Sequence, residues 1–170
     1  MINIDKMDSM DIVLLAGLYG SGKTEFARQY FHGRGRYRIS RSEIRKSIYE
    51  MTNFGEKWDA KHFNEMDDTL VKHIERKIIE HYSHHKRKIL LINTFVTKKS
   101  RKMHLELANK SRKTIGIVFL HTPLRVCLEQ NEKYSKGVPA SVINTLYPRI
   151  ELPSKAEGFT DVQIIEDFTI

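Results

Sequence analysis

The sequence has few of the features that mark secreted or membrane proteins. It contains a single cysteine, Cys127, so no disulfide can form within the chain, as expected in a reducing cytosol. Its longest apolar run, residues 12–18, is far shorter than the ~20 residues that a transmembrane helix needs. Residues 1–11 are polar and acidic and lack the basic and apolar regions of a secretory signal. We therefore expect a cytoplasmic protein without a membrane partner.

Internal repeats, low-complexity segments and linkers are also missing from the 170 residues, which is the usual size of one domain. Hydrophobic residues make up 40% of the chain, too many for a disordered protein. We expect one domain over residues 1–170, with residues 1–10 as an N-terminal extension. The 29 Lys and Arg residues exceed the 21 Asp and Glu residues, and the net charge of +8 favours a polyanionic partner, although basic solvated faces also occur without one.

Short apolar runs alternate with helical patterns along the chain. The runs are continuous rather than alternating, which is typical of strands buried on both faces of a parallel sheet. Strands are predicted at residues 11–16, 37–40, 88–92, 114–120 and 162–165. Helices are predicted at residues 23–31, 42–51, 58–82, 98–109, 123–131 and 139–147, with Ser42 as the cap of the second. This order predicts an α/β fold with a central parallel sheet flanked by helices on both faces.

One segment carries a specific chemical signal. Gly17-Leu18-Tyr19-Gly20-Ser21-Gly22-Lys23-Thr24 matches G-x-x-x-x-G-K-[ST] in full, between a predicted strand and a predicted helix. The glycines let successive backbone N–H groups converge on phosphate oxygens. Lys23 suits the β- and γ-phosphates, and the Thr24 hydroxyl suits Mg²⁺. The alternative is a glycine-rich turn with an incidental Lys-Thr pair, but the motif and its context together predict binding of ATP and Mg²⁺ through all eight residues.

The phosphate acceptor is not specified by this loop. The D-x-x-G and N-K-x-D elements of switch GTPases are not found, and a motor or AAA+ ATPase usually needs a longer chain. A short chain with a helical insertion and a polar late loop is instead built like a small kinase.

Residues 12–147 resemble the 5′-kinase domain of bacteriophage-type polynucleotide kinase-phosphatases, within a wider group that includes the zeta-toxin kinases. The segment Ile39-Ser40-Arg41-Ser42-Glu43-Ile44-Arg45-Lys46-Ser47 looks like the family's segment after its second strand. There a catalytic aspartate is followed, three residues later, by an arginine that grips the substrate's phosphate. Residues 123–131, Lys133 and the Val138-Pro139 pair look like the family's lid. The resemblance implies a P-loop kinase fold with a helical lid, which transfers the γ-phosphate of ATP to the 5′-hydroxyl end of RNA or DNA.

Several family positions are occupied differently here. The aspartate position is Ser42, with Glu43 beside it, while the partner arginine is present as Arg45. The acidic residue at the end of the third strand corresponds to Asn93. The two lid arginines fall on about Gln130 and Tyr134, which leaves Lys133 and Lys136 as the nearby cations.

The resemblance therefore implies a set of site residues, each with an alternative. Glu43 is a substitute base or an ordinary first-turn glutamate. Ser42 hydrogen-bonds substrate or caps the helix. Arg41, Arg45, Lys133 and Lys136 bind the substrate or are solvated cations. Lys23 is the catalytic cation at the γ-phosphate.

Two roles are possible for each of two further clusters of basic residues. The arginines at positions 34, 36, 38, 41 and 45 either flank an acceptor channel or form a basic loop. The basic residues at positions 98, 99, 101 and 102 either contact a phosphate backbone or begin a solvated helix. His81, His84 and His85 are interpreted as a surface cluster rather than a metal site, and Trp58 and Phe63 as core residues rather than a stacking platform.

Two other functions remain open. A kinase for a nucleotide or another small metabolite would have a closed acceptor pocket instead of an open basic groove. A catalytically weakened NTP-binding module that recognises nucleic-acid ends would explain Ser42 and Asn93 at positions where carboxylates are expected.

Overall fold

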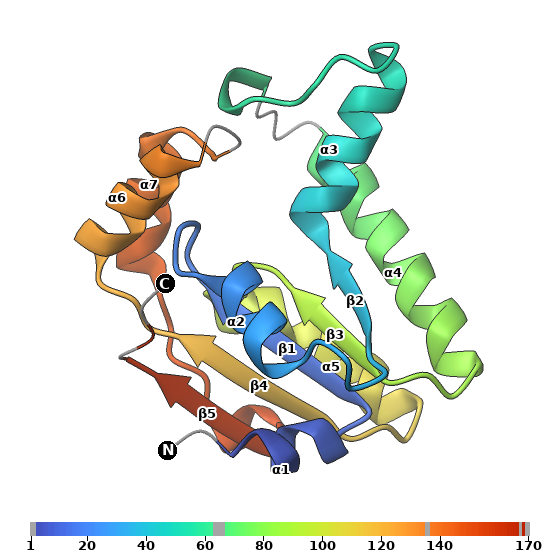
Figure 1. Ribbon diagram of the computed structural model, residues 1–170. Coiled ribbons are helices and arrows are strands. Elements are labelled where there is room, and N and C mark those ends of the chain that lie inside the picture. Colours follow the sequence, from blue (N-terminus) through green and yellow to red (C-terminus); the bar gives the residue numbers. More distant parts are fainter. Residues whose placement is uncertain (1–2, 63–66, 135–136, 167, 169–170) are drawn as a thin grey trace.

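We describe a computed structural model of the protein, in which residues 3–62, 67–134, 137–166 and 168 are placed (Figure 1). Within these residues, five strands form one sheet in the order β2-β3-β1-β4-β5, and every neighbouring pair is parallel. The strands are β1 (Ile12–Gly17), β2 (Tyr37–Ser40), β3 (Ile89–Ile92), β4 (Ile115–Leu120) and β5 (Asp161–Ile165). The helices are α1 (Ile4–Ser9), α2 (Lys23–Tyr30), α3 (Arg41–Thr52), α4 (Asp68–His84), α5 (Lys98–Lys110), α6 (Leu124–Lys133) and α7 (Ala140–Leu146). The predicted α/β fold is confirmed.

The central strand β1 explains the continuous apolar runs. It pairs with β3 on one side and β4 on the other, so that Ile12 lies between Ile89 and Ile115, and all six of its residues are buried. Because successive side chains point to opposite faces, both faces of β1 need an apolar cover.

The two faces of the sheet belong to two separate cores. Val13 and Leu15 point toward α1 and α2, where they pack with Met7 and Phe26. Leu14 and its same-face neighbours pack instead against α4, α5, α6 and α7. None of the described helices is long and apolar enough to span a membrane.

Two element boundaries differ from the sequence prediction. The long helix α4 begins at Asp68, ten residues later than expected; residues 53–59 form a loop, and Ala60–His62 make a 3₁₀ turn. Asp59 stabilises this turn by accepting a hydrogen bond from the Lys61 amide at 2.9 Å. Trp58 therefore lies in a loop, while the predicted helical residues Phe63 and Met66 lie outside the described residues.

The cap of α3 also differs. The helix begins at Arg41 and its N-cap is Ser40, which keeps the extended conformation of β2, so the prediction that Ser42 caps the helix is wrong. Ser42 lies in the first helical turn, where its hydroxyl is 3.0 Å from that of Ser40. The strand thus continues directly into the helix.

Residues 3–10 are integrated into the domain. They form α1, whose Met7 is fully buried beneath the sheet. The guanidinium of Arg36 donates to the backbone carbonyls of Met7, Asp8 and Met10 at 2.6–3.0 Å. Arg36 therefore joins the entry of β2 to the N-terminal helix.

Candidate active site

The loop between β1 and α2 has the backbone of a phosphate-binding loop. Gly20 and Gly22 have φ angles of +78° and +88°, in the left-handed region that favours glycine. A Cβ added at Gly20 would lie 2.1 Å from the carbonyl oxygen of Cys127 on α6, so glycine is required there by packing as well. Because α2 starts directly after Gly22, its N-terminal N–H groups and the positive end of its dipole lie at the loop.

Lys23 is folded back onto this loop. Its ammonium group donates to the carbonyl oxygens of Gly17 at 2.9 Å and Leu18 at 2.5 Å, and lies 3.3 Å from the Ser21 hydroxyl. Burial lowers the pKa of Lys23 to about 8, and the nearby charge of Glu25 opposes this effect only in part. A bound polyphosphate would add negative charge in direct contact with the lysine.

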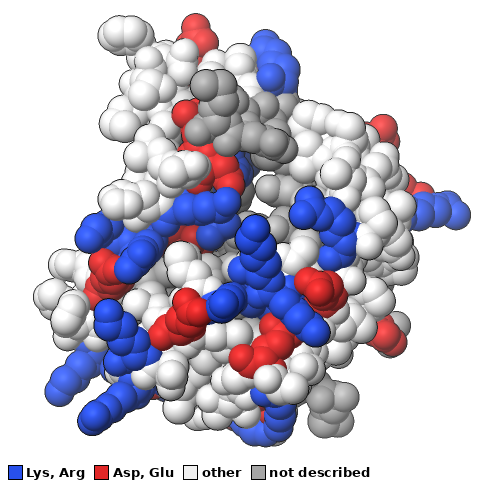
Figure 2. Space-filling model, turned by 180° about the vertical axis from the view of Figure 1, so that it is seen from behind, with Lys and Arg blue, Asp and Glu red and all other residues white. Residues whose placement is uncertain are grey.

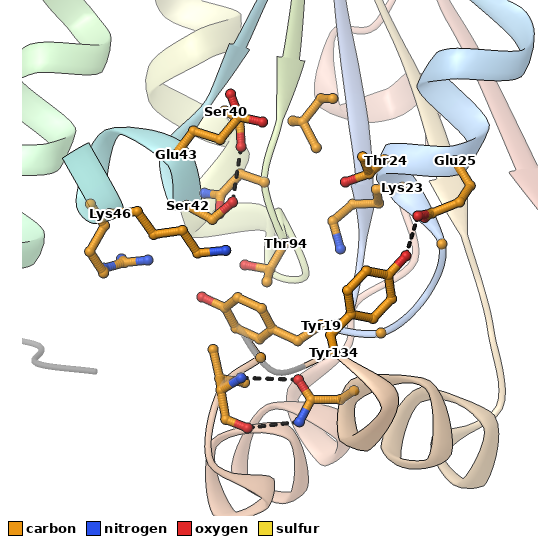
Figure 3. A pocket seen from close by; sticks show the side chains of 18 of the residues that line it. Tyr19, Lys23, Thr24, Glu25, Ser40, Ser42, Glu43, Lys46, Thr94 and Tyr134 are labelled. Carbon is orange, nitrogen blue, oxygen red and sulfur yellow. Dashed lines mark hydrogen bonds between the residues drawn. The ribbon is translucent and has the colours of Figure 1, made fainter. Parts of the chain in front are cut away.

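A pocket of about 570 Å³ opens beside Lys23 and Thr24 (Figure 3). It lies at the carboxyl ends of the strands, where open α/β sheets bind ligands. The opposite wall is formed by α3, the floor by the end of β3, and the remaining side by the loop after α6. The described residues that line these three sides include Ser42, Glu43, Arg45, Lys46, Asn93, Thr94, Asn131, Tyr134 and Val138.

The first turn of α3 brings Ser42 and Glu43 to this pocket, opposite the P-loop. The Glu43 carboxylate accepts two hydrogen bonds from Arg38, at 2.7 and 2.9 Å. This ion pair is about half exposed, so Arg38 orients the carboxylate while leaving it accessible to solvent. The two residues expected to replace the missing aspartate thus border the same pocket as Lys23.

Arg45 also lines the pocket, but it is held by other residues of the protein. Its guanidinium donates to Asp68 at the start of α4, at 2.9 Å, and only 9% of its side chain is exposed. Burial raises the pKa of the P-loop residue Tyr19, and the adjacent charge of Arg45 opposes this effect. Arg45 therefore links the P-loop wall to the α3 wall.

Arg41 does not reach the pocket, which corrects the prediction that it binds substrate. It is buried and donates through two nitrogens to the Glu75 carboxylate on α4, which is fully buried. His104 on α5 approaches the other Glu75 oxygen to 3.8 Å. Burial alone would raise the pKa of Glu75, but His104 and Arg41 outweigh it and hold the pKa below its usual value. Arg41 thus has a structural role between three helices.

Other predicted cations are likewise paired with carboxylates of the protein. Arg34 pairs with Asp5 at 3.0 Å at the surface, and Arg36, whose side chain is buried, pairs with Asp8 at 2.8 Å. Arg101 is fully buried and pairs with Glu157 at 2.8 Å. The expected acceptor channel along residues 34–45 is therefore largely a set of internal ion pairs, with Arg45 as its pocket-lining member.

The residues after α6 lie where the lid was expected. The Asn131 side chain donates to the Val138 carbonyl at 2.7 Å and accepts from its amide at 3.0 Å, which ties the end of α6 to Val138. The Tyr134 hydroxyl donates to the carboxylate of Glu25, next to Thr24 on α2. Lys133 is exposed and does not line the pocket, and Lys136 lies outside the described residues.

Two features of the pocket were missed from the sequence. Lys46 lies four residues after Ser42 and therefore on the same face of α3, a spacing that the sequence already contains. Trp58 is buried, as expected for a core residue, but it also lines the pocket beside Tyr49, whose ring centre is 5.7 Å away. No sequence signal distinguished this loop residue from a helical core residue.

The described residues of this site do not include a cluster of metal-binding side chains. Among the residues that the structure places, no group of three or more His, Cys, Asp or Glu side chains is arranged to hold a metal ion. The His81 and His85 rings stack on each other at the end of α4, with centres 4.5 Å apart. The oxygen ligand expected for Mg²⁺, the Thr24 hydroxyl, lies at the pocket mouth.

Several solved structures share this fold. One is a chain of the Pnkp1/Rnl/Hen1 RNA repair complex (TM-score 0.64, 15% identity), which matches 81% of this chain but only 43% of its own length. A sugar kinase from Janibacter sp. HTCC2649 matches with TM-score 0.64 and 14% identity over 91% of this chain and 84% of its own. Kti12 from Chaetomium thermophilum, in complex with ADP-AlF3, matches with TM-score 0.62 and 18% identity over 91% and 88%.

These likenesses establish the fold and leave the acceptor open, because a chain of an RNA repair complex and a sugar kinase appear together. No curated protein is significantly similar in sequence. The model of the AAA_33 family, described as an AAA domain, matches residues 12–153. Because this match includes the P-loop, both pocket walls and the lid, the chain belongs to the AAA_33 family and has its P-loop kinase-like fold.

Proposed function

We propose that the protein is an ATP-dependent phosphotransferase that moves the γ-phosphate, with Mg²⁺, onto a hydroxyl acceptor. The observation that carries this proposal is that Lys23 and Thr24 face Ser42 and Glu43 across one pocket (Figure 3). A phosphoryl donor on one wall and a proton acceptor on the other is the arrangement that in-line transfer requires.

Each wall has a defined part in this reaction. The P-loop amides and the start of α2 hold the β-phosphate, and Lys23 leaves its carbonyl partners to bind the β- and γ-phosphates. Mg²⁺ keeps most of its waters and requires few protein ligands, so Thr24 fits as one of them. On the α3 wall, Ser42 positions the acceptor hydroxyl and Glu43 takes its proton. Positioning and charge neutralisation then account for most of the rate.

The favoured acceptor is the 5′-hydroxyl end of a polynucleotide. The net charge of +8, the resemblance along residues 39–47 and the likeness to a chain of an RNA repair complex support it. The opposing observation is that acidic and basic side chains are intermixed on the surface, as Figure 2 shows for one face.

A small-molecule acceptor is the second candidate. It is favoured by the pairing of Arg36 and Arg41 with carboxylates inside the fold, which removes these two arginines from any open groove. A weakened NTP-binding module is the third, because Ser42 and Asn93 replace expected carboxylates.

One experiment separates the three. ATP labelled at the γ-phosphate is offered to 5′-hydroxyl RNA and DNA oligonucleotides and to a panel of nucleosides, nucleotides and sugars, with the Lys23→Met variant as the inactive control. We expect label on an oligonucleotide, and an acceptor KM that rises steeply with salt as counterions are released. Label on a small compound only, with a salt-independent KM, would support the second candidate. ATP and oligonucleotide binding without transfer would support the third.

The role of Glu43 has its own test. Glu43→Gln keeps the side-chain shape and should lower kcat by about 10²–10⁴-fold, with little change in ATP affinity. Glu50→Gln is the matched control, because Glu50 lies on the same helix and is paired with Lys57. Ser42→Asp restores the carboxylate expected from the resemblance and should raise kcat. A silent Glu43→Gln together with an inert Ser42→Asp would exclude this arrangement of the site.

A further inference from the structure

Lys46 also lines the pocket, and it takes no part in the phosphate-binding and proton-transfer steps proposed for the other residues. It lies one turn beyond Ser42 on α3, so both residues belong to the same face of the helix. Figure 3 shows its ammonium group extending from α3 into the pocket, toward Thr94 and the side occupied by Lys23. The side chain is partly buried rather than solvated.

The charge distribution around the pocket is uneven. The described lid residues that line it, Asn131, Tyr134, Gly137 and Val138, are neutral. Tyr134 is committed to Glu25, whose carboxylate adds a negative charge near Thr24. Lys133, which was expected to supply a positive charge from the lid, does not line the pocket. Within the described residues, four cations line the pocket: Lys23 and Arg28 come from α2 on the P-loop side, and Arg45 and Lys46 come from α3 opposite it.

Arg45 and Lys46 both lie on α3, but their surroundings differ. The Arg45 guanidinium donates to Asp68 and lies close to Tyr19. The Lys46 side chain extends into the pocket toward Thr94, on a flexible chain that ends in a compact charge. Arg45 is thus suited to holding α3 and the P-loop in register, and Lys46 to meeting a charge that develops within the pocket.

We propose that Lys46 is a catalytic residue that offsets the charge of the phosphoryl group in transit; this inference rests on the proposed phosphotransferase function. The bond between the γ-phosphorus and the β–γ bridging oxygen breaks, and its electrons remain with ADP. A bond forms from the acceptor oxygen to the phosphorus, and the acceptor proton passes to Glu43. Lys46 keeps its proton throughout and contacts the equatorial oxygens of the phosphoryl group, the role that cations serve in such transfers.

The test measures this contact without knowledge of the acceptor. Aluminium fluoride with ADP and Mg²⁺ mimics the phosphoryl group in transit, with water in place of the acceptor. The measured quantity is the fluoride ratio, the Kd of ADP alone divided by the Kd of ADP with aluminium fluoride. Lys46→Met preserves length and helix propensity while removing the charge. We expect it to lower the fluoride ratio by about tenfold or more and to leave the Kd of ADP unchanged.

Two further variants control for indirect effects. Lys46→Arg should recover most of the fluoride ratio, because the charge is restored. Lys110→Met removes an exposed lysine from the last turn of α5, at the opposite edge of the sheet, and should leave the fluoride ratio at the wild-type value.

The outcomes separate this inference from the proposed function. A wild-type protein that binds ADP without any fluoride enhancement contradicts the phosphotransferase function, and the role of Lys46 with it. If aluminium fluoride enhances ADP binding in the wild type, and the fluoride ratio of Lys46→Met stays within twofold of the wild-type ratio, only the role of Lys46 is overturned. An equal loss of affinity for ADP and for ADP with aluminium fluoride would overturn it as well, because Lys46 would then act on the fold of the site.

Discussion

The two walls of the pocket are built in different ways. The P-loop wall consists of consecutive residues whose backbone forms the site, with Gly20 and Gly22 in conformations that favour glycine. The α3 wall depends on side chains, and two arginines of this helix are held by partners far away in sequence. Arg41 and its partner Glu75 are 34 residues apart, and Arg45 and its partner Asp68 are 23 residues apart.

This difference decides what a sequence can reveal. A backbone site is specified by local conformation, so its residue types and their order identify it. An arginine beside a predicted pocket binds a ligand or an internal carboxylate, and the sequence alone does not distinguish the two. Ion pairing inside the protein removed Arg41 from the acceptor site and left Arg45 at its edge.

The largest effect is expected on the P-loop wall, when the Lys23 side chain is removed. Lys23→Met should lower phosphate transfer by about 10³-fold or more, because it deletes the cation at the β- and γ-phosphates. ATP binding should weaken strongly in isothermal titration, while the thermal unfolding midpoint should be maintained. Wild-type turnover in this variant would contradict the P-loop assignment.

The second test addresses the α3 wall. Arg41→Met leaves Glu75 as a buried carboxylate beside His104 only, and should lower the free energy of unfolding by about 3–5 kcal/mol. Chemical denaturation measures the loss. The transfer rate per folded molecule should change little, because Arg41 lies outside the pocket.

Two companion variants make this test specific. Arg76→Met breaks an exposed pair with Glu80 on the surface of α4 and should be nearly neutral. The double variant Arg41→Met/Glu75→Leu removes the unpaired carboxylate and should regain much of the lost stability. A stable Arg41→Met protein with a raised acceptor KM would return Arg41 to the substrate site.

The same contrast holds for the fold as a whole. The strands and the α5, α6 and α7 helices were predictable to within about two residues, because their patterns are local. The start of α4 was not predictable in this way. Trp58 packs beside Tyr49 in a loop, although its position in the sequence fits the apolar spacing of the helix. The burial of α1 was missed as well, since its partners, the sheet and Arg36, come from later in the chain.

The last prediction concerns the charge of Lys23 itself. Burial lowers its pKa to about 8 in the free protein, so the lysine is charged below this pH and increasingly neutral above it. Bound phosphates favour the charged form and raise the pKa again. ATP affinity should therefore be nearly constant below pH 7 and should fall by about tenfold between pH 7 and pH 9, since the charged fraction of the free lysine falls by that factor.

Isothermal titration in buffers of different ionisation enthalpy checks both parts of this prediction. Near pH 8.5 the protein should take up a large fraction of one proton on binding ATP, and at pH 6.5 the uptake by Lys23 should vanish. The neighbouring Cys127 thiol does not interfere, because burial raises its pKa to about 11 and it stays protonated over this range. Lys23→Met should remove the proton uptake and flatten the affinity profile. If the wild-type affinity were equally flat between pH 7 and pH 9, the ammonium group would already be fully charged in the free loop. The contacts to the Gly17 and Leu18 carbonyls would then be sufficient to offset its burial.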